Sequence, residues 1–138
     1  KVYISRSINR DLKSGDIIVF YRTKHEGPAF YTSVATTVAV VENIHTNISS
    51  LADFQRICRK RSVFSDAELA KHWNYDPRNR PFAVDFLYVY TFPKRMNLKA
   101  LTEAGILREA PRGFEPLSDE QFQKLCEGSN ADKRYFVD

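Results

Sequence analysis

Residues 15–22 read Gly-Asp-Ile-Ile-Val-Phe-Tyr-Arg, and the interpretation of the whole chain starts from this stretch. The run from Ile17 to Tyr21 is apolar or aromatic at every position, which is typical of a strand buried on both faces. Gly15 stands where a left-handed residue ends a helix, so we expect a short helix that ends at residues 13–14. The stretch therefore predicts a helix, a tight turn and a central strand.

Two more segments are predicted as strands. Residues 31–42 are rich in the β-branched side chains that strands favour, and residues 82–92 place large apolar side chains at alternate positions. We expect both segments to join residues 17–22 in one curved, mostly antiparallel sheet. The interior of this sheet is expected to hold Phe20, Val38, Val40, Phe86 and Tyr88.

Capping motifs predict the helices. Ser50 precedes an apolar stripe at helical spacing, and Ser65 and Ser118 each begin a capping box. Asn97 is expected to cap a shorter helix that ends at Gly105. Because strands and helices are mixed without βαβ regularity, the sequence predicts an α+β fold. We expect a single domain with a small, mostly antiparallel, barrel-like sheet and peripheral helices.

The length of 138 residues is typical of one domain, and we expect residues 1–138 to form one. The first residue is Lys rather than Met, so we interpret the chain as an excised C-terminal fragment. Residues 129–138 are expected either to fray or to pack as an edge strand. No apolar run approaches about 18 residues, so we expect no membrane span.

The two cysteines, Cys58 and Cys126, each continue the apolar stripe of a predicted helix. They are therefore predicted to be unbonded core thiols, which is typical of a cytoplasmic protein. The histidines lie far apart and no Cys-x-x-Cys or His-x-x-x-His spacing occurs, so we expect no metal and no cofactor. No set of nucleophile, base and orienting group can be assigned, which makes an enzyme the least favoured class.

Positive charge is concentrated in the first half of the chain. Residues 1–62 carry ten Lys or Arg against five Asp or Glu, and residues 56–61 (Arg-Ile-Cys-Arg-Lys-Arg) supply four of these cations. On a helix whose other face is apolar, they would form one exposed patch that suits phosphates. A plain solvated helix face would show the same pattern. The predicted phosphate contacts are Arg56, Arg59, Lys60 and Arg61.

Asp85 interrupts a strand whose neighbours are nearly all apolar. A buried carboxylate must be hydrogen-bonded or paired, so two roles fit. One is a salt bridge with an arginine inside the fold, and the other is acceptance of N–H bonds from a bound base. Aromatic residues are abundant, with ten Phe and seven Tyr, and some could stack on a base.

The order of motifs resembles EVE-type domains of the PUA-like superfamily. The resemblance begins at residues 9–22, with a predicted helix, a Gly-Asp turn and a Phe-Tyr strand. It continues through Val84-Asp85-Phe86, Pro93, Leu98, Leu101, residues 116–118 and residues 121–122. The chain also resembles PUA-like modules that follow an acetyltransferase domain in some bacterial proteins. It lacks the Gly-x-Lys-x-x-Glu-x-Arg signature of ASCH domains.

This resemblance implies a non-catalytic module that binds nucleic acid, RNA or DNA, including a modified or flipped base. The base pocket is expected beside the Gly-Asp turn, where hydroxyls, a stacking ring, a planar cation and an acceptor would meet. Its predicted residues are Ser5, Ser7, Tyr21, Arg22, Thr23, Ser33 and Asp85. The alternative is a regulatory or interaction domain attached to an N-terminal, acetyltransferase-type catalytic domain.

Overall fold

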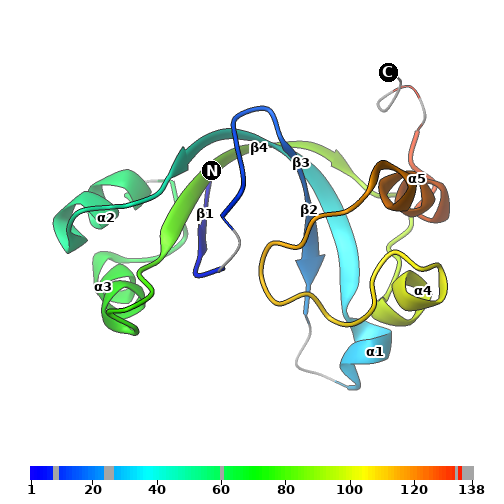
Figure 1. The fold of residues 1–138 in the computed structure, drawn as a ribbon, viewed down its shortest axis with the longest axis horizontal. Helices are drawn as coiled ribbons and strands as arrows, with labels where there is room; N and C mark the ends of the chain where they lie inside the picture. Colours follow the sequence, from blue (N-terminus) through cyan, green and yellow to red (C-terminus); the bar gives the residue numbers. More distant parts are fainter. Residues whose placement is uncertain (8–9, 24–26, 60, 133, 135–138) are drawn as a thin grey trace. The chain divides into compact units, whose positions relative to one another are not determined.

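The computed structural model describes residues 1–7, 10–23, 27–59, 61–132 and 134 (Figure 1). Its strands are β1 (Val2–Ser5), β2 (Ile17–Arg22), β3 (Val34–His45) and β4 (Phe82–Thr91). They form one sheet in the order β1-β4-β3-β2, in which β1 pairs antiparallel with β4. The expectation that the three predicted strands share one sheet is confirmed, and β1 is an addition to it.

The helices of the described residues are α1 (Ala29–Thr32), α2 (Leu51–Cys58), α3 (Asp66–Asn74), α4 (Leu98–Glu103) and α5 (Asp119–Gly128). The predicted α+β class is therefore confirmed. The chain divides into two compact units. Unit 1 comprises Lys1–Ile17 and Val40–Leu87, and unit 2 comprises Ile18–Ala39 and Tyr88–Asp138.

Unit 1 has an aromatic core between α2 and α3, which pack on each other. The ring centroids of Phe54 and Trp73 lie 5.4 Å apart. Leu69 from α3 and Ala83 from β4 are completely buried in the same cluster. Burying side chains of this size stabilises the folded state by roughly 1.5–3 kcal/mol each, so this cluster is what holds both helices in place.

Unit 2 has its own apolar core, to which α4 contributes Leu101 and α5 contributes Leu125. Its buried members are Ala35, Val38, Phe92, Met96, Leu101, Ile106 and Leu125. Residues 129–132 continue from α5 with fixed partners, since Lys94 N–H donates to the Ser129 carbonyl (3.1 Å) and Asp132 N–H donates to Tyr90 Oη (2.9 Å). Residues 133 and 135–138, on which the expected edge strand would fall, lie outside the described residues.

The helix caps expected from the sequence are confirmed. Ser50 accepts a backbone N–H at the start of α2, and Ser65 and Ser118 form complete capping boxes at the starts of α3 and α5. Asn97 caps α4, and Gly105 beyond its end has a φ of +76°. Each side-chain cap is worth about 1 kcal/mol, and together the caps fix where these helices begin.

The prediction of a helix that ends at residues 13–14 is wrong, because residues 10–13 are not helical. Asp16 and Lys13 instead close a tight turn reciprocally: Asp16 Oδ2 accepts the Lys13 N–H (2.9 Å), and the Lys13 carbonyl accepts the Asp16 N–H (3.0 Å). Gly15 sits inside the turn with a φ of +93°. An aspartate side chain that accepts a hydrogen bond from the nearby backbone competes with helix formation, and here it stabilises the turn instead.

The second predicted strand begins later than expected. Tyr31 and Thr32 belong to α1, because the Pro28 carbonyl accepts both of their N–H groups. Local hydrogen bonding therefore overrides the β-branched composition of this segment. The interior of the sheet also differs from the prediction at Tyr88, which is 51% exposed, whereas Val38 and Phe86 are buried.

Two arginines of unit 1 complete the C-terminal end of α3. Arg6 Nη2 donates to the His72 carbonyl, and Arg80 Nη1 donates to the Trp73 carbonyl. The last carbonyls of a helix have no partner within it and carry partial negative charge, so guanidinium groups are favoured there. Arg80 also lies over the Trp73 ring, 4.8 Å from its centroid. No local sequence pattern predicts this network, because its partners lie far apart in the chain.

Arg10 extends the network to the loop after α3. It donates to the Ser7 carbonyl (3.0 Å), to Asn79 Oδ1 (2.7 Å) and to the Arg80 carbonyl (2.8 Å). Its guanidinium carbon also lies 4.6 Å from the centroid of the Phe82 ring. One side chain thus connects the segment before the turn to the start of β4.

We expect Arg10→Ala to lower the free energy of unfolding by about 2–4 kcal/mol, because three bonds and a ring contact are lost and two carbonyls lose a donor. Urea denaturation followed by circular dichroism measures this. Arg78→Ala is the matched control, since Arg78 is exposed in the same unit and its removal should change the value by less than about 0.5 kcal/mol. Equal effects of the two variants would contradict the role given to Arg10.

Candidate phosphate-binding pocket

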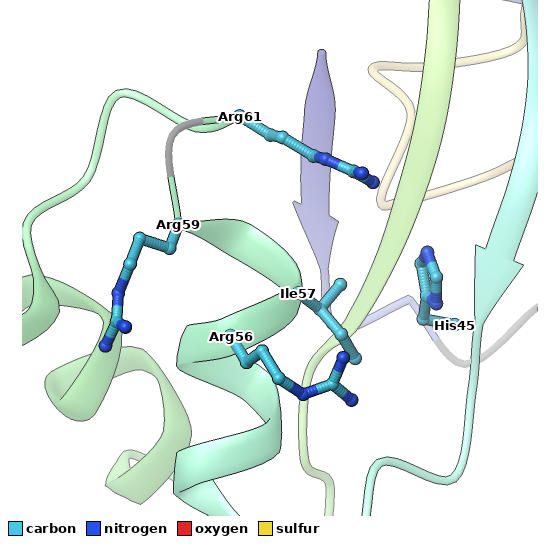
Figure 2. A pocket seen from close by; sticks show the side chains of 5 residues that line it. All are labelled: His45, Arg56, Ile57, Arg59 and Arg61. Carbon is cyan, nitrogen blue, oxygen red and sulfur yellow. The ribbon is translucent and has the colours of Figure 1, made fainter.

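A pocket of unit 1 is lined by three arginines, a histidine and an isoleucine (Figure 2). Its volume is about 590 Å³, which lies in the range of pockets that hold small ligands. Arg56 and Ile57 come from α2, Arg59 and Arg61 from the segment that follows it, and His45 from the last position of β3.

The arginines come from two kinds of backbone because α2 ends at Cys58. Arg59 has an extended conformation (φ −60°, ψ 133°), and the Cys58 carbonyl accepts the N–H groups of Arg61 (3.1 Å) and Ser62 (3.0 Å). The expectation that residues 56–61 lie along one helix is therefore wrong. Lys60, predicted as a phosphate contact, lies outside the described residues.

Each arginine of the pocket has a carboxylate neighbour. The distances are 3.3 Å from Arg61 Nη1 to Asp85 Oδ2, 3.3 Å from Arg59 Nη2 to Asp66 Oδ2, and 3.7 Å from Arg56 Nη2 to Asp53 Oδ1. All three arginine side chains are more than half exposed. The pairs of Arg56 and Arg59 join exposed groups and contribute only about 0–1 kcal/mol each, so these two guanidinium groups keep N–H donors for a ligand at little cost.

Asp85 is a buried charge beside this pocket. Its side chain is 10% exposed, and Oδ2 lies 2.9 Å from His45 Nε2 and 3.3 Å from Arg61 Nη1. The other carboxylate oxygen, Oδ1, is buried and has no hydrogen-bond partner among the described residues. Asp85 therefore has the salt bridge with an arginine that was one of the two roles predicted for it. Its contact with a bound base stays a prediction.

The two thiols are unbonded, as expected. Burial raises the pKa of the Cys58 thiol to about 11, and the charge of Asp85 adds to this shift. Burial also raises the pKa of Cys126, which is half-buried, with a smaller addition from the charge of Glu127. Cys58 is completely buried beside Phe54 on the inner side of α2. Its position and its protonation state both identify it as a core residue.

The residues predicted to form a base pocket divide between the two units. In unit 1, Ser5 and Ser7 are buried, the Ser7 N–H donates to Ser5 Oγ (3.0 Å), and Asp85 makes the ion pairs described above. The members in unit 2 range from the buried Ser33, through the half-buried Tyr21, to the exposed Arg22 and Thr23. A base pocket formed by this set stays a prediction.

His45 is the pocket residue that sequence reasoning missed. It is a lone histidine at the end of a strand, and it lies 40 residues away from Asp85 in the sequence. No local spacing connects the two residues, because strand pairing brings them together. Only a correct prediction of the register between β3 and β4 would have identified His45 as a neighbour of Asp85.

Two absences hold for the part of the chain that the structure describes. Within it, no group of three or more His, Cys, Asp or Glu side chains is placed to hold a metal ion. None of its helices is both long and apolar enough to cross a membrane.

Comparison with known proteins shows the fold. No protein-family model matches the chain, and no curated protein sequence matches it. Among solved structures, the crystal structure of ASCH from Zymomonas mobilis matches with a TM-score of 0.70 and 17% sequence identity, over 91% of this chain and 80% of that one. The chain therefore has a fold similar to that of this ASCH protein, although it lacks the ASCH sequence signature.

The raised pKa of Cys58 predicts slow chemical labelling of the folded protein. At pH 7.5 only about one Cys58 thiol in several thousand is a thiolate, so a maleimide should modify Cys126 at least tenfold faster. Mass spectrometry of peptides over a time course measures both rates, and protein unfolded in urea provides the control in which the rates converge. Rapid modification of Cys58 in the folded state would show that its burial is wrong.

Asp85→Asn should lower the free energy of unfolding by about 1–3 kcal/mol, because two charge-assisted contacts to Oδ2 are weakened. The fold should persist, since the shape of the side chain is kept and both partners can reach water. Asp66→Asn is the matched control: its pair with Arg59 is exposed, and we expect a change below about 1 kcal/mol. Urea denaturation compares the variants, and an unchanged midpoint for Asp85→Asn would contradict the stabilising role of this carboxylate.

Proposed function

We propose that the chain is a non-catalytic PUA-like module that binds nucleic acid and seats phosphates in the pocket of His45, Arg56, Arg59 and Arg61. The observation that carries this proposal is the collection of three arginines around one pocket on a fold of the PUA-like class. Arginine suits the task because its planar fork of N–H donors matches the oxygens of a phosphate.

The charge distribution supports this proposal. Residues 1–62 carry twice as many basic as acidic residues, and all three arginines of the pocket belong to this half. Phosphate contacts provide the sequence-independent part of nucleic-acid affinity, and they release counterions from the strand. Binding through this pocket should therefore be strongly salt-dependent.

The proposal extends to the base. By resemblance to EVE-type domains, a modified or flipped base would be read by the predicted set of Ser5, Ser7, Tyr21, Arg22, Thr23, Ser33 and Asp85. Asp85→Asn tests this part, because an amide offers an N–H where the carboxylate only accepts. Weaker binding of oligonucleotides by this variant, at unchanged salt dependence, would support base contact.

A regulatory domain attached to an acetyltransferase-type domain is the alternative that the sequence resemblance raises. The two functions differ in one measurable property, which is salt-dependent affinity for RNA or DNA. A chain that serves only a neighbouring domain would show none.

The triple variant Arg56→Ala, Arg59→Ala, Arg61→Ala should bind single-stranded RNA and DNA more weakly and with a flatter salt dependence. Each lost phosphate contact lowers the slope of log affinity against log salt by about 0.7–0.9, so we expect a total change of about 2–3. Fluorescence anisotropy titrations at several salt concentrations give the slopes.

The matched control is the triple variant Arg95→Ala, Arg108→Ala, Arg112→Ala, which removes the same charge at exposed positions that do not line the pocket. Its slope should stay close to that of the unmodified protein. Equal slopes for the two triple variants would mean that the pocket is only a solvated arginine cluster.

A further inference from the structure

Two of the side chains that line the pocket, Arg61 and His45, are oriented by a single buried group. Asp85 Oδ2 lies within 3.3 Å of both Arg61 Nη1 and His45 Nε2. In Figure 2 the Arg61 side chain extends toward β4, where Asp85 lies. A carboxylate that is 10% exposed cannot exchange its partners for water easily, so the Arg61 and His45 side chains are held before a ligand arrives.

His45 has one ring nitrogen left for a ligand. A carboxylate only accepts, so Nε2 must carry the proton that points at Asp85. Nδ1 is then the remaining nitrogen of a side chain that is 30% exposed and lines the pocket. In the imidazolium form Nδ1 also carries a proton, and in that form His45 can donate to an anion in the pocket.

Arg56 supplies a further donor from α2, with its exposed carboxylate neighbour 3.7 Å away. Arg59 is different, because its side chain extends toward α3 and lies 3.3 Å from Asp66 (Figure 2). The pocket thus has three groups that can serve one ligand together, namely Arg56, Arg61 and His45, with Arg59 at its margin.

We propose that this pocket binds the terminal phosphate monoester of a nucleic-acid strand, in preference to an internal phosphodiester. The inference rests on the proposed function and adds the substrate class of its phosphate site. A terminal phosphate has three non-bridging oxygens and a charge of about −1.5 to −2 near pH 7, which matches three donor groups. An internal diester offers two such oxygens and one charge.

The shape of the site agrees with this choice. A groove that follows a backbone needs cations in a row, whereas these cations come from the end of β3, from α2 and from the segment after α2 to line one pocket. A strand that ends in the pocket needs only one exit, while an internal phosphate needs two.

The experiment measures anisotropy of one labelled oligonucleotide sequence in three forms: with a 5′-phosphate, with a 3′-phosphate, and with hydroxyls at both ends. The protein should bind at least one phosphorylated form about tenfold more tightly than the hydroxyl form, as one charge-assisted contact predicts. The 5′ and 3′ arms identify which end is recognised.

His45→Gln should reduce this preference to less than about threefold, because one of the three groups placed to serve the terminal phosphate is lost. Arg61→Gln is the second variant, in case the first does not fold, and should also lower the preference. Arg59→Ala is the matched control. It should weaken all three oligonucleotides equally and keep the preference.

Equal affinity for the three forms, with a salt slope that the triple arginine variant still flattens, would overturn the terminal-phosphate site and leave the proposed function standing. No salt-dependent binding of any form would overturn both. A preference that survives in both His45→Gln and Arg61→Gln would place the recognition of the strand end elsewhere and overturn the inference.

Discussion

The buried carboxylate of Asp85 is the constraint on which the arrangement of the pocket in unit 1 depends. Removing a charge from water costs several kcal/mol unless close partners replace the water, so Asp85 requires both His45 and Arg61. Those partners come from β3 and from the segment after α2, while Asp85 itself lies opposite Val2 in the pairing of β1 with β4. The Val2 N–H also donates to the Arg61 carbonyl (3.1 Å). Val2 thus holds the backbone of Arg61 and Asp85 holds its side chain, so this side of the pocket is ordered.

The arginines of unit 1 serve two different purposes, which charge counting cannot separate. Arg6, Arg10 and Arg80 direct their N–H groups mainly at carbonyls around the end of α3, and all three are half-buried. They replace water at a helix end and stack on rings. Arg56, Arg59 and Arg61 are exposed and keep donors for a ligand. The excess of positive charge in the first half of the chain is therefore partly structural, and only the second group bears on binding.

The features that could be predicted from the sequence are those decided by local interactions. A serine three residues before a glutamate or glutamine fixes the start of α3 or α5 through atoms of one turn. The apolar run at residues 17–21 forms the predicted strand, but β2 ends the strand order and Ile17 is 55% exposed, so the expectation of a central strand buried on both faces is wrong. The missed features depend on distant partners. The short strand β1 forms because it pairs with β4. His45 belongs to the site because its side chain contacts Asp85 on β4. The helix expected to end at residues 13–14 was wrong because the Asp16 side chain accepts the Lys13 N–H within the predicted turn.

The end of α2 shows why the cluster at residues 56–61 forms a pocket rather than a helical patch. Successive residues of a helix are separated by about 100°, so a residue three or seven positions after a buried one lies on nearly the same face. Arg61 is three positions after Cys58 and seven after Phe54, both of which are completely buried. A continued helix would carry Arg61 into the aromatic core of unit 1, at the cost of burying an unpaired cation. Extended backbone at Arg59 avoids this and brings Arg61 to Asp85 instead. The apolar stripe that stabilises α2 is thus also the reason that the helix must end, and ending it there places Arg61 beside His45.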